Sequence, residues 1–153
     1  MAKKIDPATA ATRVGTSYPP PFDEPCKQRE RVRLGAAAGL TQFGVNKLRL
    51  QPGQWSSQRH WHTHEDEFIM VLEGEVVLVS DDGEARLVAG DCAGFPAGKR
   101  DGHHLQNRSA RDAIVLEVGT SNSNADVCTY SDIDMLANPA GYIHRDGTPY
   151  PKQ

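Results

Sequence analysis

The sequence predicts an all-β fold, a sandwich or barrel built from short strands. From residue 43 onward, short apolar runs alternate with turn signals rich in glycine, proline and aspartate, which is the spacing typical of these folds. No segment has a sustained apolar stripe with the 3.6-residue period of a helix. At 153 residues the chain has the length of one domain with one core.

The predicted strands are apolar or alternating segments that end at turn residues. In chain order they cover residues 45–50, 67–72, 75–79, 84–88, 92–95 and 113–118. Asp81-Asp82-Gly83 joins the third and fourth, and Asp-Gly between apolar runs is the strongest local hairpin signal. Residues 68–72 and 76–79 are apolar on both faces, so a second sheet, the N-terminal segment or another subunit must cover the outer face. We expect a homodimer, which is the economical answer.

The two ends of the chain differ from this central region. Residues 1–33 carry five prolines and no periodicity, which favours an extended arm, and Tyr18, Phe22 and Val32 can lie against the rest of the protein. We expect an N-terminal arm over residues 1–33, a barrel over 34–120 and a C-terminal tail over 121–153 that packs on the barrel.

One short helix is predicted in the C-terminal tail. The segment Ser131-Asp132-Ile133-Asp134 has the residue types that cap a helix N-terminus. Asn138-Pro139 would end such a helix soon after Leu136. We therefore predict at most one short C-terminal helix in an otherwise β-structured chain.

Composition excludes several classes of function. The formal net charge is −3, 24% of the residues are charged, and like charges do not gather in blocks, so we expect neither a nucleic-acid nor a membrane partner. The N-terminus has no apolar core of signal-peptide length, and we expect a cytoplasmic protein. Cys26, Cys92 and Cys128 are widely spaced, which predicts reduced thiols rather than a disulfide framework or a thiolate zinc site.

Histidines and acids are concentrated between residues 60 and 67. Successive side chains of a strand alternate, so His60 and His62 share a face, and a turn through residues 63–66 can bring Glu67 back beside them. Imidazole nitrogens and a carboxylate are ligands for divalent metals. This segment alone leaves open a second interpretation, a solvated turn that happens to be rich in histidine.

Two spaced motifs connect this segment with a second cluster downstream. His60-Trp61-His62, four residues, Glu67, six residues and Gly74 resemble the first motif of the cupin superfamily. Gly90, five residues, Pro96-Ala97-Gly98, then His103, three residues and Asn107 resemble the second motif. The chain departs from the family pattern in two loops: six residues separate Gly53 from His60 where five are usual, and four separate Gly98 from His103 where two are usual.

The resemblance implies a double-stranded β-helix, or jelly-roll barrel, of a small single-domain cupin. It also implies one divalent transition metal, held near one end of the barrel by His60, His62, Glu67 and His103. Ligands of this type suit Mn, Fe, Co, Ni, Cu or Zn without choosing among them, and octahedral coordination would leave two open positions. Since ligating imidazoles are neutral, we expect metal occupancy to fall below about pH 6.5.

Neighbouring side chains are less suited to be ligands. His64 shares the strand parity of His60 and His62, but only two residues would then separate it from Glu67. His104 and Trp61 alternate away from the predicted metal and are expected to pack or to form hydrogen bonds elsewhere.

The resemblance implies a metal-dependent enzyme acting on a small polar substrate, namely a sugar, a sugar phosphate or an oxygenated acid, as an isomerase, epimerase or dioxygenase. Candidate acids and bases are His64, Asp66, Asp101, Arg59, Arg100 and Tyr142, and the sequence does not choose among them. Basic residues that could bind a phosphate are Arg49, Arg59, Lys99, Arg100 and Arg108. The alternatives are a non-catalytic metal- or sugar-binding sensor that acts through a protein partner, and a storage role.

Overall fold

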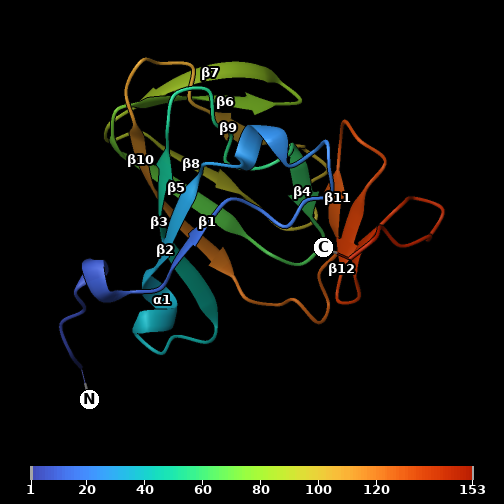
Figure 1. Cartoon of the computed structure of the whole chain (residues 1–153), viewed down its shortest axis with the longest axis horizontal. Coiled ribbons are helices and arrows are strands. Elements are labelled where there is room, and N and C mark those ends of the chain that lie inside the picture. The colour runs from blue at the N-terminus through green and yellow to red at the C-terminus, as the bar shows by residue number, and fades with distance from the viewer. Residues whose placement is uncertain (1, 153) are drawn as a thin grey trace.

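Antiparallel sheets make up the fold in the computed structural model, which describes residues 2–152 (Figure 1). The largest sheet orders its strands as β1 (Thr12–Val14), β2 (Glu30–Arg33), β3 (Phe43–Leu50), β10 (Ala113–Thr120), β5 (Glu67–Glu73) and β8 (Cys92–Phe95). A second sheet orders β13 (Gly141–Ile143), β12 (Leu136–Asn138), β11 (Cys128–Tyr130) and β4 (His60–His62). A third joins β7 (Gly83–Val88), β6 (Glu75–Ser80) and β9 (His104–Gln106).

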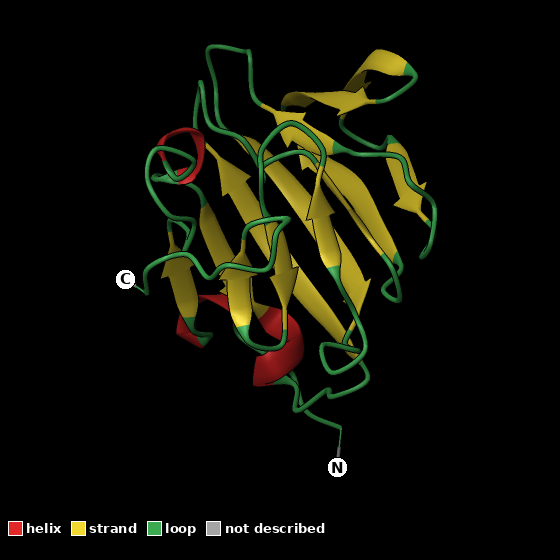
Figure 2. Ribbon diagram, turned by 90° about the vertical axis from the view of Figure 1, so that its right-hand side faces the viewer, coloured by secondary structure: helices red, strands yellow, loops and turns green. Residues whose placement is uncertain are grey.

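The all-β prediction is confirmed, and each predicted strand lies within an observed one. The predicted hairpin joins β6 to β7, with Ser80 paired to Gly83 across the turn. Within residues 2–152, helical structure is limited to α1 (Leu34–Ala37) and two 3₁₀ turns at Pro7–Thr9 and Glu24–Cys26, and Figure 2 shows how little of this part is helical. None of the helices formed by residues 2–152 is long and apolar enough to cross a membrane.

The prediction of at most one short C-terminal helix holds, but the helix that it allowed after residue 130 does not form in the part of the chain described. Residues 131–134 form a bend that leads into β12. The carboxylate of Asp132 accepts two hydrogen bonds from Arg59, at 2.9 and 2.7 Å, and that of Asp134 accepts the backbone N–H of Arg145 at 2.9 Å. The two carboxylates that would cap a helix therefore hold distant segments instead.

The N-terminal segment is more than an extended arm, because part of it extends the largest sheet. Strand β1 pairs with β2, and β2 pairs with β3 so that Arg31 lies opposite Leu48. Tyr18 is buried, and Phe22 packs beside it against the C-terminal strands. Contacts of this kind hold the N-terminal segment against the C-terminal strands. The division of the chain into an arm, a barrel and a tail at residues 33 and 120 stays a prediction.

Two apolar clusters stabilise the fold. The larger lies between the sheets and consists of Leu48, Leu50, Ile69, Val71, Val76, Leu105, Ala113 and Val115. The smaller joins the N-terminal segment to β11 and consists of Tyr18, Cys26, Cys128, Tyr130 and Met135. On β5 the inward Ile69 and Val71 are buried, while Phe68 and Leu72 on the other face are 42% and 43% exposed. This face is apolar as the sequence predicts, and the homodimer that would cover it stays a prediction.

Candidate metal centre

Three separate segments bring the predicted metal ligands together. His60 and His62 are the first and last residues of β4 and share a face, as strand alternation requires. Glu67 begins β5, and His103 precedes β9. His60 and His103 exchange backbone hydrogen bonds of 3.2 and 2.9 Å, which place the second motif directly beside the first.

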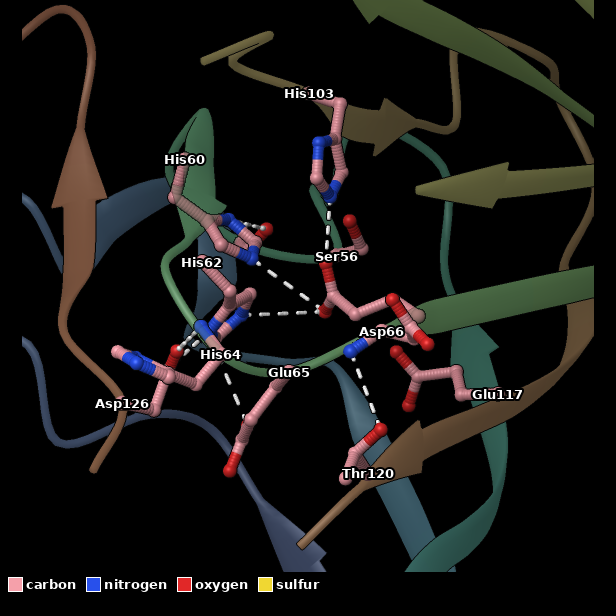
Figure 3. Close-up of polar contacts among 12 residues, drawn as sticks. Ser56, His60, His62, His64, Glu65, Asp66, His103, Glu117, Thr120 and Asp126 are labelled. Carbon is pink, nitrogen blue, oxygen red and sulfur yellow. Dashed lines mark hydrogen bonds and ion pairs between the residues drawn. The ribbon is translucent and has the colours of Figure 1, made fainter. Parts of the chain in front are cut away.

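The three imidazoles converge on one carboxylate. His103 Nε2 lies 2.6 Å from Glu67 Oε2, and the Nε2 atoms of His60 and His62 each lie 3.5 Å from Glu67 Oε1. Figure 3 shows the rings of His60, His62 and His103 pointing toward one another from different parts of the fold. Three imidazole nitrogens thus face one carboxylate, as the resemblance to the two motifs implies, and the ligand atoms of His60, Glu67 and His103 lie within 4.8 Å of one another.

Each imidazole is oriented by a hydrogen bond on its other nitrogen. His60 Nδ1 donates to the Gln58 carbonyl at 2.8 Å, and His103 Nδ1 donates to the Asp101 carbonyl at 2.9 Å. His62 Nδ1 lies 2.6 Å from the carboxylate of Asp126. Carbonyl and carboxylate oxygens only accept, so Nδ1 carries the proton in all three rings. The three Nε2 atoms facing Glu67 are the positions left for a cation, as in known carboxylate–histidine–metal arrangements.

The electrostatics of the cluster follow from these contacts. Burial alone would raise the pKa of Glu67, but its hydrogen bonds with His103, His60 and His62 outweigh burial and hold that pKa well below its usual range. Burial alone would lower the pKa of His62, but Glu67 and Asp126 outweigh it and raise the value to about 9. Metal binding at His62 must therefore release a proton, and protons compete at a higher pH than the free imidazole value of about 6.5 suggests.

The centre lies on the wall of a cavity of about 720 Å³. Phe95 stacks on His103 with ring centroids 3.7 Å apart and fixes the plane of that imidazole. Glu65, Glu117 and Tyr130 line the same cavity as the four predicted ligands. The space is large enough for a small polar molecule to approach the Nε2 atoms.

Cys128 is a further possible ligand, because its sulfur and the imidazoles of His60 and His62 lie within 4.8 Å of one another. Burial raises the pKa of this thiol. Only the thiolate is a metal ligand, and a thiol this reluctant to ionise is a poor donor. We therefore favour Glu67 and His103 as the partners of His60 and His62.

The structure places the other polar candidates of the two motifs outside this cluster. His64 is exposed, and its ring contacts the hydroxyl of Thr63 at 2.8 Å. The Asp66 carboxylate accepts the backbone N–H of Ala97, and Asp101 accepts that of Asp81. The Tyr142 hydroxyl contacts Ser17. None of these side chains contacts a Glu67 oxygen in the part of the chain described.

The basic residues named as candidates for binding a phosphate are engaged elsewhere. Ion pairs join Arg49 to Glu30 and Asp112, Arg59 to Asp81 and Asp132, and Arg108 to Glu84. The guanidinium of Arg100 lies over the ring of Trp61, 5.8 Å from its centroid. Of this set, Lys99 lines a smaller cavity of about 160 Å³ that also contacts Glu67 and His103.

Asp126 is a site residue that no sequence pattern singles out. It lies in a polar stretch that looks like a linker, 64 residues from His62. Its second oxygen accepts the backbone N–H of His64 at 2.8 Å, so one buried carboxylate orients both the ring of His62 and the turn that follows β4.

Replacing Asp126 by asparagine is expected to weaken metal binding about 10- to 100-fold, because carboxylates that orient a ligating histidine contribute on this scale. An amide retains the shape of the side chain but not its charge. The dissociation constant, measured by competition with a chromophoric chelator, checks this. Asp134→Asn is the matched control, since the Asp134 carboxylate likewise holds an imidazole, that of His144 at 2.9 Å, away from the metal centre. Equal affinities for wild type and Asp126→Asn would contradict the assignment.

His104 is buried and forms hydrogen bonds as a neutral ring. Its Nδ1 donates to the Ser57 carbonyl at 2.8 Å, and its Nε2 accepts from the Gln106 amide at 2.9 Å. Burial lowers the pKa of His104 to about 4, against about 6.5 in an unfolded chain. Between these values the unfolded chain takes up a proton that the folded protein does not, so stability falls as the pH falls.

Acidification from about pH 7 to pH 5 is therefore expected to lower the free energy of unfolding of wild type by about 2 kcal/mol more than that of His104→Gln. The variant lacks the titrating ring, so its starting stability is lower but this part of its pH dependence is absent. Urea unfolding at both pH values measures the difference. Parallel losses in the two proteins would show that His104 is not the titrating group.

Comparison with known proteins is consistent with this geometry. A family model described as a cupin domain matches residues 46–119. A crystal structure from Silicibacter pomeroyi, described as a sugar phosphate isomerase from a cupin superfamily, has 44% sequence identity to this chain and a TM-score of 0.91, with 97% of each chain covered. No curated protein matches the chain in sequence.

Two more distant structures share the fold alone. One from Acidithiobacillus ferrooxidans has 24% identity and a TM-score of 0.72, with 82% of each chain covered. The polyketide cyclase RemF from Streptomyces resistomycificus has 18% identity and a TM-score of 0.63, with 78% of this chain and 80% of that one covered. Matching motifs, matching strands and a relative of nearly equal extent lead to one conclusion: this chain belongs to the cupin superfamily.

Proposed function

We propose that this protein is a metal-dependent isomerase of a sugar phosphate. The observation that carries the proposal is the arrangement of His60, His62 and His103, each held through Nδ1 with Nε2 directed at Glu67, on the wall of a cavity. The name of the Silicibacter pomeroyi relative supports the choice of substrate.

The donor set fits a divalent transition metal. His60, His62, Glu67 and His103 would hold it, because three oriented imidazoles and a carboxylate of low pKa offer one negative charge and three lone pairs. When bound, such a metal supplies Lewis-acid chemistry: it polarises a carbonyl and eases proton removal from the neighbouring carbon. The same ligands also suit iron or copper, which is why oxygen chemistry is the competing reaction class.

Isomerisation also needs a group that moves a proton, and we assign this role to Glu65. Among the cavity-lining carboxylates, Asp126 is held by His62, and Glu117 by Arg31. Glu65 lines the cavity, accepts the backbone N–H of Asn122 through Oε1 at 2.8 Å, and has its Oε2 3.8 Å from His62 Nδ1. A carboxylate held by one oxygen keeps the other in place for proton transfer.

The test measures metal and turnover in the same preparation. Protein purified without added metal is analysed for transition metals, then incubated in D₂O with aldose and ketose phosphates of three to six carbons while NMR follows isomer formation and deuterium uptake. We expect metal-dependent interconversion with deuterium at the carbon beside the carbonyl. A metal-loaded protein that neither interconverts nor exchanges any of these substrates would refute the proposal.

Oxygen consumption is recorded in parallel, since uptake with an oxygenated acid would identify a dioxygenase. Tight binding of a sugar phosphate with neither exchange nor oxygen uptake would instead favour the sensor module. The identity of the metal separates the reaction classes further: zinc or manganese suits Lewis-acid chemistry, and iron or copper suits oxygen chemistry.

A further inference from the structure

Two arginines from the N-terminal segment lie on the wall of the same cavity as the metal centre. Arg29 is 6% exposed and precedes β2, and Arg31 lies within β2. Both guanidinium groups donate to one acceptor, the backbone carbonyl of Ser56, Arg31 over 2.9 Å. One buried and one half-buried cation are therefore held side by side at a single acceptor.

Their charges are only partly balanced. Arg31 forms a bidentate ion pair with Glu117, with distances of 2.6 and 3.0 Å. Arg29 donates to the carbonyls of Gly15 and Ser56, and within residues 2–152 no carboxylate forms an ion pair with it. Burial and the adjacent charge of Arg31 lower the pKa of Arg29, and Glu117 offsets only part of that effect. The group formed by Arg29, Arg31 and Glu117 has a net charge of +1, whereas the other carboxylates of the cavity, Glu65, Glu67 and Asp126, lie beside His62. A buried cation without its own ion pair favours an anionic partner.

Arg29 and Arg31 are connected to the metal centre in two ways, through Ser56 and Ser57 and through the cavity that they share with it. Ser56 accepts from both arginines, and the hydroxyl of the following Ser57 lies 3.2 Å from His60 Nδ1. Arg31, Glu117 and His60 line the same space. One small ligand that reaches the Nε2 atoms at one end can therefore place a second group near the guanidinium groups.

A purely structural role explains only part of these observations. Arg29 does tie the N-terminal segment to the body of the protein through Ser56, and its guanidinium lies over the ring of Tyr18, 5.7 Å from the centroid. A tether needs hydrogen-bond donors but not a second, half-buried cation beside it. Guanidinium groups bind phosphate and carboxylate groups in bidentate fashion, and a cavity that excludes water strengthens such contacts.

We propose that Arg29 and Arg31 form an oxyanion subsite that binds the phosphate or carboxylate group of the ligand, while the remainder of the ligand faces the metal centre. The identity of the whole ligand rests on the proposed sugar-phosphate chemistry, whereas the subsite itself is defined by charge. Glu117 then limits the affinity, because it neutralises one of the two cations.

The experiment is calorimetric titration of inorganic phosphate into the metal-free and the metal-loaded protein. Because the subsite does not require the metal, both forms are expected to bind phosphate. Arg29→Gln is expected to weaken binding at least about tenfold, which is the scale of a lost charge-assisted hydrogen bond. Arg49→Gln is the matched control and should bind as wild type does, since Arg49 lies on the neighbouring β3 and is paired with Glu30 and Asp112.

A second variant is expected to have the opposite effect. Glu117→Gln removes the carboxylate that neutralises Arg31, so phosphate binding should tighten about tenfold, a gain that damage to the fold would not produce. This variant keeps the proposal testable if Arg29→Gln does not fold. Phosphate affinity equal to wild type in Glu117→Gln, or in a folded Arg29→Gln, would overturn the subsite.

Further titrations separate the two sources of the oxyanion. A sugar phosphate, a sugar acid and the matching neutral sugar are compared in wild type and Arg29→Gln. The subsite predicts that only the two anionic ligands lose affinity in the variant, and the one that loses more identifies the natural group. Binding that depends on Arg29 and Glu117 without turnover would refute the proposed isomerase but retain the subsite. Turnover with phosphate affinities that are insensitive to Arg29 and Glu117 would refute the subsite but retain the isomerase.

Discussion

The double variant His60→Ala, His103→Ala is expected to retain less than about one-tenth of the metal that wild type carries, and to lose turnover about a thousandfold or more. The change removes one imidazole from each motif and leaves His62 and Glu67 of the four predicted ligands. Because a single imidazole and one carboxylate do not make a site for a transition metal at micromolar concentration, loss of the metal precedes loss of activity. Elemental analysis after gel filtration, with a parallel assay of activity, measures both effects.

His64→Ala is the matched control for the double variant. It also removes an imidazole from the histidine-rich segment, but His64 is exposed and points to Thr63 rather than to Glu67. We expect it to keep its full metal content. Phe95 loses its stacking partner when His103 is replaced, so thermal unfolding must first show that the double variant is folded. Equal metal content in the folded double variant and in His64→Ala would refute the four-ligand site.

The second large effect is expected at Gly74, which ends the first motif. Its backbone has a φ of +73°, and a Cβ atom added there would lie 2.6 Å from the backbone carbonyl oxygen of Asp112. Neither backbone can yield without disturbing the pairing of β10 with β5. Gly74→Ala is expected to lower the free energy of unfolding by at least about 3 kcal/mol. This is the sum of the cost of a left-handed conformation at alanine and the cost of a backbone clash. Urea unfolding measures the change.

Gly90, at the start of the second motif, separates the two causes. Its φ of +96° is also positive, but no described atom lies within 4 Å of the added Cβ. Gly90→Ala should therefore cost only about 1 kcal/mol, the conformational part alone. Equal losses at the two glycines would show that the clash at Gly74 is relieved by movement of the chain, and that the close approach of β10 is not what requires glycine there.

Local patterns were sufficient to predict most of the fold and the central part of the site. The alternation of side chains puts His60 and His62 on one face whatever lies around them, and the hairpin between β6 and β7 depends on its own turn residues. The predicted helix after residue 130 failed because its two capping acids are engaged by Arg59 and Arg145, which no local pattern reveals.

The sequence by itself determined the all-β class and the strands, because each depends on a pattern within a short stretch of chain. The predicted ligands His60, His62, Glu67 and His103 came from the resemblance to two spaced motifs. Only the tertiary structure decided which other groups join them. Asp126 reaches His62 across 64 residues, and Arg31 reaches Glu117 across 86. Both contacts are set by how distant strands pair, and a hydrogen bond or an ion pair leaves no periodic trace in the sequence. The charge of the cavity, and with it the choice of ligand, is therefore a property of the folded protein.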